Sequence, residues 1–291
     1  MRSERPAAPP VVVVTGVSTG IGNGIARHLV GVGVRVFGSV RRHQDAERLS
    51  GELGERFVPL IFDVTDEAAV RRGAEEVRRR LEGERLSGLV NNAGIAVAGP
   101  LLEMPLEEFR RQIEVNLVSV LSVTQAFFPL LRAASDGARA GRIITISSVA
   151  GQFALPFLGP YAASKHGVEG LSDSLRRECL RNGVEVVVID PGSVATPIWT
   201  KAKEQDLSAY SASPWLAAMT KMQAAMIASG RRGMAPERIG ALVWKVLQAR
   251  RPRARYVVGS GRALVWMARH LLSARFVDRV IARNLGLRPD R

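Results

Sequence analysis

Seven short apolar runs, rich in valine and isoleucine, recur along the chain with amphipathic stretches between them. The runs are residues 11–14, 34–40, 57–62, 89–90, 142–146, 184–189 and 256–258. Between the third and fourth runs, residues 68–81 place one apolar stripe among arginines and glutamates. Strands that are apolar along their whole length and alternate with helices are typical of a parallel sheet covered on both faces. The alternation therefore predicts an α/β fold, a doubly wound parallel seven-stranded sheet flanked by helices on both faces.

The length of the chain fits one such domain. With 291 residues, 46% of them hydrophobic, the chain can bury a large core, and we expect residues 1–291 to form a single domain. Residues 193–232 make a long excursion between the sixth and seventh predicted strands, which we expect to form a substrate lid. Ser213 and Pro214 there resemble the N-cap and first position of a helix. Residues 261–291 form a basic amphipathic C-terminal extension.

Charge and cysteine content restrict the setting. The single cysteine, Cys179, excludes an internal disulfide, lies in a helical pattern and is expected to be buried rather than nucleophilic. No signal-like segment is evident and no run approaches the roughly 18 apolar residues of a spanning helix, which predicts a soluble, cytoplasmic protein. The net charge of +14 suggests nucleic acid, but the arginines are dispersed and no nucleic-acid motif accompanies them. We therefore expect no nucleic-acid partner, although a positive surface favours an anionic cofactor.

A glycine-rich turn follows the first predicted strand. Gly16 permits a sharp turn, Gly20 permits close approach of the backbone to a diphosphate, and Gly22 is expected to let the next helix pack on the strand. Amides at the start of a helix face a bound anion, and the helix dipole favours its charge. Because the turn joins a strand to a helix, it predicts a dinucleotide-binding Rossmann fold rather than a purely structural turn.

The spacing of this turn, TGxxxGIG, resembles that of the short-chain dehydrogenase/reductase family. The resemblance covers about residues 10–260, and the layout looks similar to the steroid and retinol dehydrogenase branch. It implies that Asp63 and Val64 contact the adenine, and that the NNAG motif at residues 91–94 braces the sheet and lines the cofactor cleft. The cofactor-binding residues that it implies in these motifs are Gly16, Ser18, Thr19, Gly20, Ile21, Gly22, Asp63, Val64, Asn91, Ala93 and Gly94.

The end of the second predicted strand bears on the choice of cofactor. A carboxylate there accepts hydrogen bonds from a ribose 2′-hydroxyl, but this strand ends in Arg41 and Arg42 with no acid. Arg41 can pair with a 2′-phosphate, which predicts NADP(H) in preference to NAD(H). The alternative is that both arginines are merely solvated, and Thr19 stands where some NADP-preferring relatives carry a basic residue.

A tyrosine and a lysine four residues apart form the centre of the predicted chemistry. Tyr161 and Lys165 would share one helix face, and Ser148 lies 13 residues before Tyr161 at the end of the fifth strand. Taken alone, the pair also fits an exposed aromatic residue beside an exposed lysine. Together with Asn116 and the glycine turn, however, these residues match the catalytic tetrad of the resembling family.

The resemblance implies a role for each member of the tetrad. Tyr161 would act as general acid/base; an ordinary phenol titrates near ~10, and Lys165 would favour its phenolate. In the family this lysine also holds the nicotinamide ribose, and Ser148 would stabilise the substrate oxygen. Asn116 would hold a proton-passing water, although a buried amide is also often a structural bridge. The resemblance further implies that Pro191 and Gly192 bound the nicotinamide pocket and that Thr196 binds its carboxamide; no metal is expected.

Apolar residues near these motifs suggest the substrate. We expect a hydrophobic secondary alcohol, ketone or aldehyde, steroid-like or retinoid-like, although each residue also fits an ordinary core or oligomer contact. Relatives pair through the helix that bears the tyrosine, which implies a homodimer or homotetramer. Residues 261–285 are expected to cover the cleft or a partner subunit, with peripheral membrane contact as the alternative. A non-catalytic dinucleotide sensor is the competing function. The pocket candidates are Phe153, Leu155, Phe157, Leu158, Trp199, Trp215, Met219 and Met222.

Overall fold

Seven parallel strands form one sheet in the computed structural model, which describes residues 9–132, 140–197, 207–259, 267 and 271–287. Their order across the sheet is β3-β2-β1-β4-β5-β6-β7, so the winding direction reverses between β1 and β4. The strands are β1 Val11–Val14, β2 Arg35–Val40, β3 Phe57–Ile61, β4 Gly88–Asn91, β5 Arg142–Ile146, β6 Glu185–Pro191 and β7 Arg255–Val258. The predicted doubly wound parallel sheet is confirmed, and ligands in such folds bind outside the carboxyl ends of the strands at the reversal.

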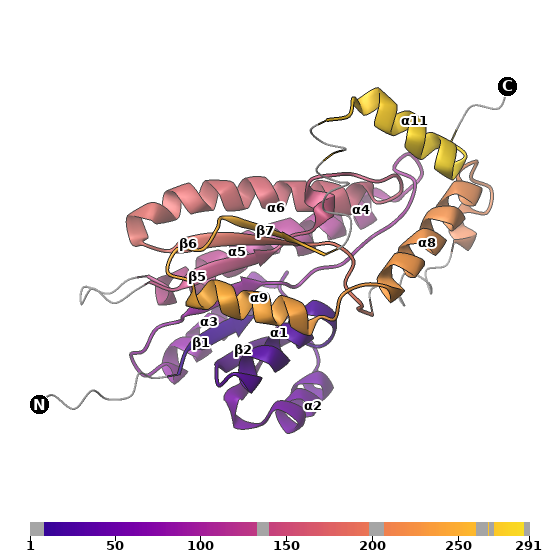
Figure 1. Cartoon of the computed structure of the whole chain (residues 1–291). Helices are drawn as coiled ribbons and strands as arrows, with labels where there is room; N and C mark the ends of the chain where they lie inside the picture. The colour runs from indigo at the N-terminus through magenta and orange to yellow at the C-terminus, as the bar shows by residue number, and fades with distance from the viewer. Residues whose placement is uncertain (1–8, 133–139, 198–206, 260–266, 268–270, 288–291) are drawn as a thin grey trace, which may run out of the picture.

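Helices cover both faces of this sheet (Figure 1). The helices α1, α2 and α9 contribute to the core on one face, whereas α3, α5 and α6 contribute to the core on the other. Their bounds are α1 Gly20–Gly31, α2 His43–Leu53, α3 Glu67–Arg80, α4 Leu106–Ile113, α5 Ser119–Phe127, α6 Gly159–Glu178, α8 Leu216–Arg231, α9 Glu237–Gln248 and α11 Ala274–Leu285.

The first strand shows why the runs are apolar throughout. Val12 and Val14 pack into the core that contains α1 and α9, whereas Val11 and Val13 pack into the core that contains α3 and α5. All four valines are at most 2% exposed. Because successive side chains of a strand point to opposite faces, a strand between two cores needs apolar residues at every position.

The helical run through α4, a π-helical turn at Glu114–Val118 and α5 departs from the sequence expectation. Residues Leu106–Leu130 are long and apolar enough to cross a membrane by length and composition, with a hydropathy of 1.4. The expectation that no run approaches this length was therefore wrong. The run packs against α3 and α6 and against β4, as a core helix of a globular domain does. One third of its most apolar window is buried, and most of the rest is partly buried.

The described helices of the predicted lid and extension, α8 and α11, pack together beyond one end of the strands (Figure 1). The expected helix start at Ser213 and Pro214 is wrong by two residues: α8 begins at Leu216. Ser213 instead accepts a hydrogen bond from the Trp215 amide at 3.2 Å, within a turn that precedes the helix. Trp199 of the predicted pocket lies outside the described residues.

Candidate active site

The glycine turn adopts backbone conformations that favour glycine. Gly16 has a φ of +70° and Gly20 a φ of +63°, both in the left-handed region. A Cβ at Gly16 would lie 2.9 Å from the Ala93 Cα, so the turn contacts the NNAG segment closely. The Gly16 amide donates to Ser39 Oγ at 2.9 Å, which ties the turn to β2. The turn is therefore held from both neighbouring strands.

Gly22 makes its close contact at a different place from the one expected. A Cβ there would lie 2.3 Å from the Gly16 oxygen and 2.4 Å from Asn92 Nδ2. The contact is thus with the turn and the NNAG segment rather than with the strand. The glycine that lets α1 approach another element is Gly24, whose Cβ would lie 2.5 Å from Pro236 Cβ at the start of α9.

The NNAG segment braces β1 and β4 through hydrogen bonds. Thr15 Oγ1 accepts from the amides of Asn92 and Ala93 at 2.9 and 3.0 Å. Asn92 Nδ2 donates to the Thr15 oxygen at 2.9 Å, and Asn91 Nδ2 donates to Thr124 Oγ1 on α5 at 2.9 Å. The bracing that the motif implies is therefore present in the structure.

Asn116 connects this segment to the helix that bears Tyr161. Its Oδ1 accepts from the Ile95 amide at 2.8 Å, and its Nδ2 donates to the Ile95 oxygen at 3.0 Å and to Ser164 Oγ at 3.2 Å. Ser164 Oγ donates in turn to the main-chain carbonyl oxygen of Tyr161 at 2.7 Å. Both amide atoms are engaged with protein groups, so the geometry favours the structural-bridge interpretation of this side chain over that of a water holder.

Ser148, Tyr161 and Lys165 come together at the carboxyl end of β5. A hydrogen bond joins the hydroxyl of Ser148 to the phenol of Tyr161. Lys165 Nζ donates to the Ile146 oxygen at 2.8 Å and lies 5.8 Å from the centroid of the Tyr161 ring. The tyrosine and the lysine thus share one face of α6, as their spacing predicts, and the lysine is buried rather than exposed.

Burial dominates the charge states of this pair. It raises the pKa of Tyr161 above its ordinary value, and the hydrogen bond from Ser148 lowers it only in part. Burial also lowers the pKa of Lys165 to about 8, against the opposing charges of Glu169 and Asp190. The sequence predicts a phenol that ionises easily, but in the protein alone the neutral phenol is favoured, because desolvation raises its pKa more than the hydrogen bond with Ser148 lowers it.

The end of β2 presents arginines, as expected. Arg41 has a side chain that is 72% exposed and lies 3.8 Å from Asp63 Oδ2 at the end of β3. Arg42 pairs with Asp45 at 3.0 Å, so a carboxylate is present in α2 but is engaged by arginine. Arg48, which the sequence reading did not single out, donates to the Ser18 oxygen of the glycine turn at 2.9 Å. Arginines therefore lie near the place where an adenosine ribose would lie, each of them paired with an acid.

The predicted nicotinamide residues follow β6. Pro191 is the last residue of that strand, and the Gly192 amide donates to the Val258 oxygen of β7 at 2.8 Å. Thr196 lies opposite the glycine turn, because a Cβ at Gly20 would be 3.5 Å from Thr196 Cβ. The turn after β1 and the segment after β6 thus face each other at the carboxyl end of the sheet.

The predicted substrate residues separate into two groups. Leu158, Met219 and Met222 are buried, whereas Phe153, Phe157 and Trp215 are partly exposed and Leu155 is 36% exposed. Phe157 has a φ of +64°, which is uncommon for a bulky residue, and its oxygen accepts from the Gly99 amide at 2.9 Å. The strained backbone directly precedes α6.

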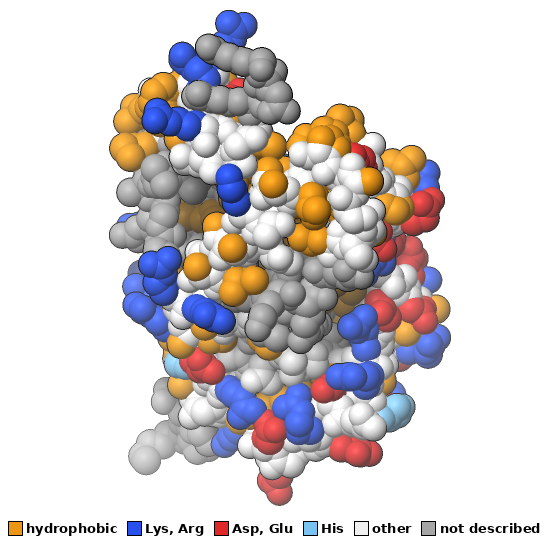
Figure 2. Space-filling view, turned by 90° about the vertical axis from the view of Figure 1, so that its right-hand side faces the viewer, with side chains coloured by type: hydrophobic (Ala, Val, Ile, Leu, Met, Phe, Trp, Pro, Cys, Tyr) orange, Lys and Arg blue, Asp and Glu red, His pale blue; other side chains and the backbone are white. Residues whose placement is uncertain are grey.

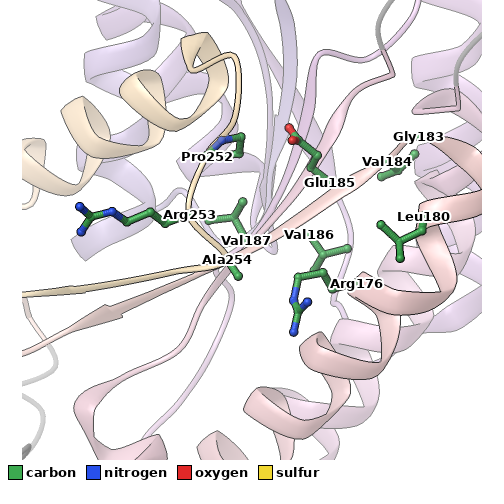
Figure 3. Close-up of a pocket in the computed structure, with 10 residues that line it drawn as sticks. All are labelled: Arg176, Leu180, Gly183, Val184, Glu185, Val186, Val187, Pro252, Arg253 and Ala254. Atoms are coloured by element: carbon green, nitrogen blue, oxygen red, sulfur yellow. The ribbon is translucent and has the colours of Figure 1, made fainter.

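Surface character divides the end of the molecule that carries these residues. In Figure 2, which views the structure from the right-hand side of Figure 1, apolar side chains gather in the upper half and charged ones in the lower half. A cavity of about 280 Å³ lies elsewhere, at the amino end of β6, between α6 and the segment before β7 (Figure 3). Ser148 and Tyr161 are at the carboxyl ends of the strands, so this cavity is separate from the candidate site.

Sequence reasoning missed several polar residues that position the site. Gln112, fully buried in α4, accepts from the Val97 amide at 2.7 Å and donates to the Ile95 oxygen at 3.0 Å. Its position one turn before Asn116 was the available signal. Glu169 likewise follows Lys165 by four residues, and Asp190 directly precedes Pro191, but nothing in the sequence connected the two acids.

Comparisons with known proteins agree with this geometry. A model of the short chain dehydrogenase family matches residues 10–207. An NADPH-dependent 3-dehydrocapnine reductase from Ornithobacterium rhinotracheale is 39% identical, over 94% of this chain and 96% of that protein. Human retinol dehydrogenase 5 is 32% identical, over 96% of this chain and 90% of that protein.

A solved structure shares the fold. A short-chain dehydrogenase/reductase from Burkholderia phymatum in complex with NAD superimposes with a TM-score of 0.76 at 21% identity, covering 89% of this chain and 92% of that one. The family model and the two relatives, which align over nearly the whole chain, show that this protein is an oxidoreductase of the short-chain dehydrogenase/reductase family, similar to its retinol and steroid dehydrogenases.

Proposed function

We propose that this protein is an NADP(H)-dependent oxidoreductase that transfers hydride between the nicotinamide and a hydrophobic ketone or secondary alcohol. The observation that carries the proposal is the arrangement of Ser148, Tyr161 and Lys165 at the carboxyl end of β5, on the same sheet edge as the glycine turn. A non-catalytic dinucleotide sensor would have no use for a serine hydroxyl aimed at a buried phenol.

The residues of the turn fit a dinucleotide. The first turn of α1 holds no acidic residue, and Thr19 at its N-cap makes no side-chain hydrogen bond to the helix amides. Gly20 has a positive φ and carries no side chain that would stand in front of these amides. The start of α1 is therefore available to a diphosphate, which helix amides and the helix dipole stabilise.

The chain supplies proton transfer and orientation for the reaction. A bound nicotinamide supplies or accepts the hydride. Tyr161 gives its phenolic proton to the substrate oxygen during reduction, or removes a proton during oxidation. Ser148 donates a hydrogen bond to that oxygen and stabilises its developing charge. Lys165, held by the Ile146 oxygen, places a positive charge beside the phenol and binds the nicotinamide ribose.

Reduction is the proposed direction near neutral pH. Because burial raises the pKa of Tyr161, the phenol retains its proton there and is ready to act as an acid. The similar protein from Ornithobacterium rhinotracheale is a reductase, which supports the same direction. Deprotonation of the phenol for alcohol oxidation requires higher pH or the additional positive charge of the oxidised nicotinamide.

The preference for NADP(H) rests on arginines around the end of β2. Arg41 is largely exposed, so its guanidinium group can approach a 2′-phosphate. Arg48 lies beside the glycine turn but is paired with Asp45 and Glu52. The end of β2 carries no carboxylate that would accept from a free 2′-hydroxyl and repel the phosphate. NADPH dependence of the similar reductase supports this choice.

The substrate is proposed to be a lipophilic molecule that enters between α8 and the segment before α6. Trp215, Met219 and Met222 lie at the start of α8 and in its body, and Phe153 and Phe157 lie in the segment before α6. The names of the relatives agree with a lipophilic substrate, because one of them is a retinol dehydrogenase. Trp199 and the remaining lid residues outside the described part of the chain carry no part of this proposal.

A second copy of the chain is the proposed partner for the outward side of the helical run Leu106–Leu130. This run is apolar but its most apolar window is only one third buried, and Leu106 and Val118 are 63% and 40% exposed. A homodimer or homotetramer would cover that face and the neighbouring helix α6. Light scattering behind gel filtration measures the mass; a monomer at micromolar concentration would contradict the assignment.

An anionic lipid surface is the proposed contact of α11. The helix buries none of its residues, leaves Phe276 and Val280 more than 40% exposed, and carries Arg275, Arg279 and Arg283 against a single acid, Asp278. A basic helix with exposed apolar residues binds the boundary of an anionic membrane. The helix packs on α8, and cover of the cleft or of a partner subunit by residues 261–285 stays the alternative. Such contact is compatible with the proposed cytoplasmic location.

A screen of lipophilic ketones and alcohols tests the activity. Retinal, steroid ketones and 3-dehydrocapnine are offered with NADPH and with NADH, and nicotinamide absorbance is followed. We expect turnover of at least one ketone, faster with NADPH. A protein that binds NADPH but turns over none of these carbonyls, with Tyr161→Phe indistinguishable from the wild type, would support the dinucleotide sensor instead.

A further inference from the structure

A buried cluster of polar side chains lies behind Lys165, further from the glycine turn along α6. Tyr161, Lys165 and Glu169 follow one another at intervals of four residues, so they line one face of that helix. Glu169 is 9% exposed, and Asp190, near the end of β6, is fully buried. Two acids inside the protein require partners, because an ionised carboxylate is costly to bury alone.

The partners come from two other elements. Gln152 Nε2 donates to Asp190 Oδ2 at 2.6 Å, and Arg255 on β7 forms an ion pair with Glu169 Oε2. Arg255 Nε also lies 3.6 Å from Asp190 Oδ2. One guanidinium therefore serves both acids, and its Nη2 lies 4.0 Å from Asp173 as well. Without Lys165, which lies beside Tyr161, the cluster holds three carboxyl groups and one cation, Arg255.

Two oxygens of this cluster remain without a donor. Glu169 Oε1 and Asp190 Oδ1 are buried, and none of the described residues donates a hydrogen bond to either. Arg255 draws the two carboxyl groups together, since it pairs with Glu169 Oε2 and its Nε lies 3.6 Å from Asp190 Oδ2. A hydrogen bond between two carboxyl groups requires a proton on one of them. A single retained proton would therefore satisfy the contact and remove one of the two buried charges.

We propose that Glu169 and Asp190 share one proton as a carboxylic acid–carboxylate pair, clamped by Arg255 and Gln152, and that this pair is a positioning unit which keeps Lys165 positively charged. The inference rests on the proposed function, since Lys165 matters only if it assists Tyr161. It adds residues from β6 and β7 that no motif of the chain assigns to the reaction.

The charge states favour this arrangement. Burial, together with the hydrogen bond and charge of Glu169, raises the pKa of Asp190 to about 8, so the proton resides on Asp190 at neutral pH. Burial lowers the pKa of Lys165 to about 8, and the charges of Glu169 and Asp190 oppose that change. Among the described residues, the other charged groups recorded around the pair are Arg255 on β7 and Asp173 on α6.

The pair responds to pH in the direction that protects the lysine. As pH rises through about 8, Asp190 loses its proton and a second negative charge appears near Lys165. A nearby negative charge raises the pKa of an ammonium group. The loss of one proton from the pair therefore delays the loss of the proton from Lys165, and the charge beside Tyr161 is maintained over a wider range of pH.

Infrared difference spectroscopy of the cofactor-free protein tests the shared proton. The wild type at pH 7 is expected to show the carbonyl band of a protonated carboxylic acid, which fades as pH rises through about 8 and is absent in Asp190→Asn. Absence of the band in the wild type, or its persistence in Asp190→Asn, overturns the proposal. This measurement needs no substrate, so it is decided even if the proposed oxidoreductase activity fails.

The pH profile of ketone reduction tests the action on Lys165. The double variant Glu169→Gln with Asp190→Asn removes the negative charge of the pair, because Asp190 alone would ionise once Glu169 no longer raises its pKa. Lys165 then loses its proton at lower pH, and the phenol of Tyr161 holds its own proton more tightly. The alkaline limb of the profile is expected to move upward by roughly one pH unit. The control is Glu178→Gln, an exposed residue of the same helix, which leaves the limb in place. A uniform loss of rate at every pH with no shift, or the same shift in the control, overturns the positioning role.

Discussion

The two ends of the binding edge are built differently. At the glycine turn, backbone amides, Thr15 and the NNAG segment form a closely packed hydrogen-bonded unit in which three glycines leave no room for a side chain or require positive φ. Around α8 and α11, contacts are fewer, side chains are more exposed, and α11 buries no residue. The glycine turn is a closely packed, rigid site for one class of ligand, whereas the second end presents an apolar surface that tolerates ligands of different shapes.

This difference indicates that the two ends select their ligands with different stringency. A dense hydrogen-bonded turn discriminates by rejecting any atom that does not fit, because close-packed backbone cannot move cheaply. An apolar surface of partly exposed side chains discriminates weakly, since each methylene contributes only about 1 kcal/mol. Mutations at the turn should therefore affect every substrate equally, and mutations at α8 should affect substrates individually.

The largest expected effect comes from Gly22→Ala in the turn. The added Cβ would lie 2.3 Å from the Gly16 oxygen, and we expect NADPH affinity to fall about 10- to 100-fold, because overpacking costs about 1–3 kcal/mol. Isothermal titration with NADPH measures the change. The matched control is Gly31→Ala at the end of the same helix, where nothing lies within 4 Å, and it should bind normally. Equal losses of affinity in both variants would contradict the claim that close packing at the glycine turn determines NADPH binding.

Arg41→Ala should separate the two cofactors. Loss of a charge-assisted hydrogen bond to the 2′-phosphate is expected to weaken NADPH binding about 30-fold, from about 2 kcal/mol, while NADH binding changes little. Dissociation constants for both cofactors are compared in the variant and in Arg110→Ala, an exposed arginine of α4. A parallel loss for NADPH and NADH would show that Arg41 does not contact the 2′-phosphate.

Trp215→Ala probes the apolar end. Removal of the indole before α8 should raise the KM of a lipophilic ketone about tenfold, since about 1.4 kcal/mol of apolar contact is lost, and should leave the dissociation constant of NADPH unchanged. The effect is expected to vary among ketones of different shape. If the variant loses cofactor affinity instead, the division between the two ends is wrong.

The smallest effect is expected at α11. Arg279→Ala removes one of its exposed basic groups, and each such group contributes about 1 kcal/mol near an anionic membrane, so binding should weaken about fivefold. Sedimentation with vesicles of phosphatidylglycerol measures binding, and vesicles of phosphatidylcholine provide the uncharged comparison. If the wild type binds neither kind of vesicle, the proposed contact of α11 with an anionic membrane is wrong.

Local patterns predicted most of the cofactor end. The apolar runs, the turn at Gly16–Gly22 and the spacing of Tyr161 and Lys165 each require particular residue types within a short segment. The runs form the strands, and the turn and the tyrosine–lysine pair lie at the carboxyl ends of those strands. The hydrogen bond between Ser148 and Tyr161 also agrees with that prediction. Short-range chemistry of this kind is visible in a single sequence because it does not depend on distant partners.

The remaining features depend on partners far along the chain. Arg255 pairs with Glu169 across 86 residues, and each looks like an ordinary surface residue in isolation. The raised pKa of Tyr161 follows from desolvation by the whole fold, which residue spacing does not reveal. The start of α8 was misplaced because Ser213 caps a turn before the helix rather than the helix itself.

Transfer of deuterium from labelled NADPH tests whether hydride passes from the nicotinamide to the carbonyl carbon of a ketone. The protein is incubated with NADPH deuterated at the transferable position of the nicotinamide and with a lipophilic ketone that it accepts, and the alcohol is examined by mass spectrometry. We expect one deuterium on the former carbonyl carbon. Product formation should fall about 100-fold or more in Tyr161→Phe, although NADPH still binds. Alcohol that carries no deuterium, or unchanged product formation by Tyr161→Phe, would contradict it.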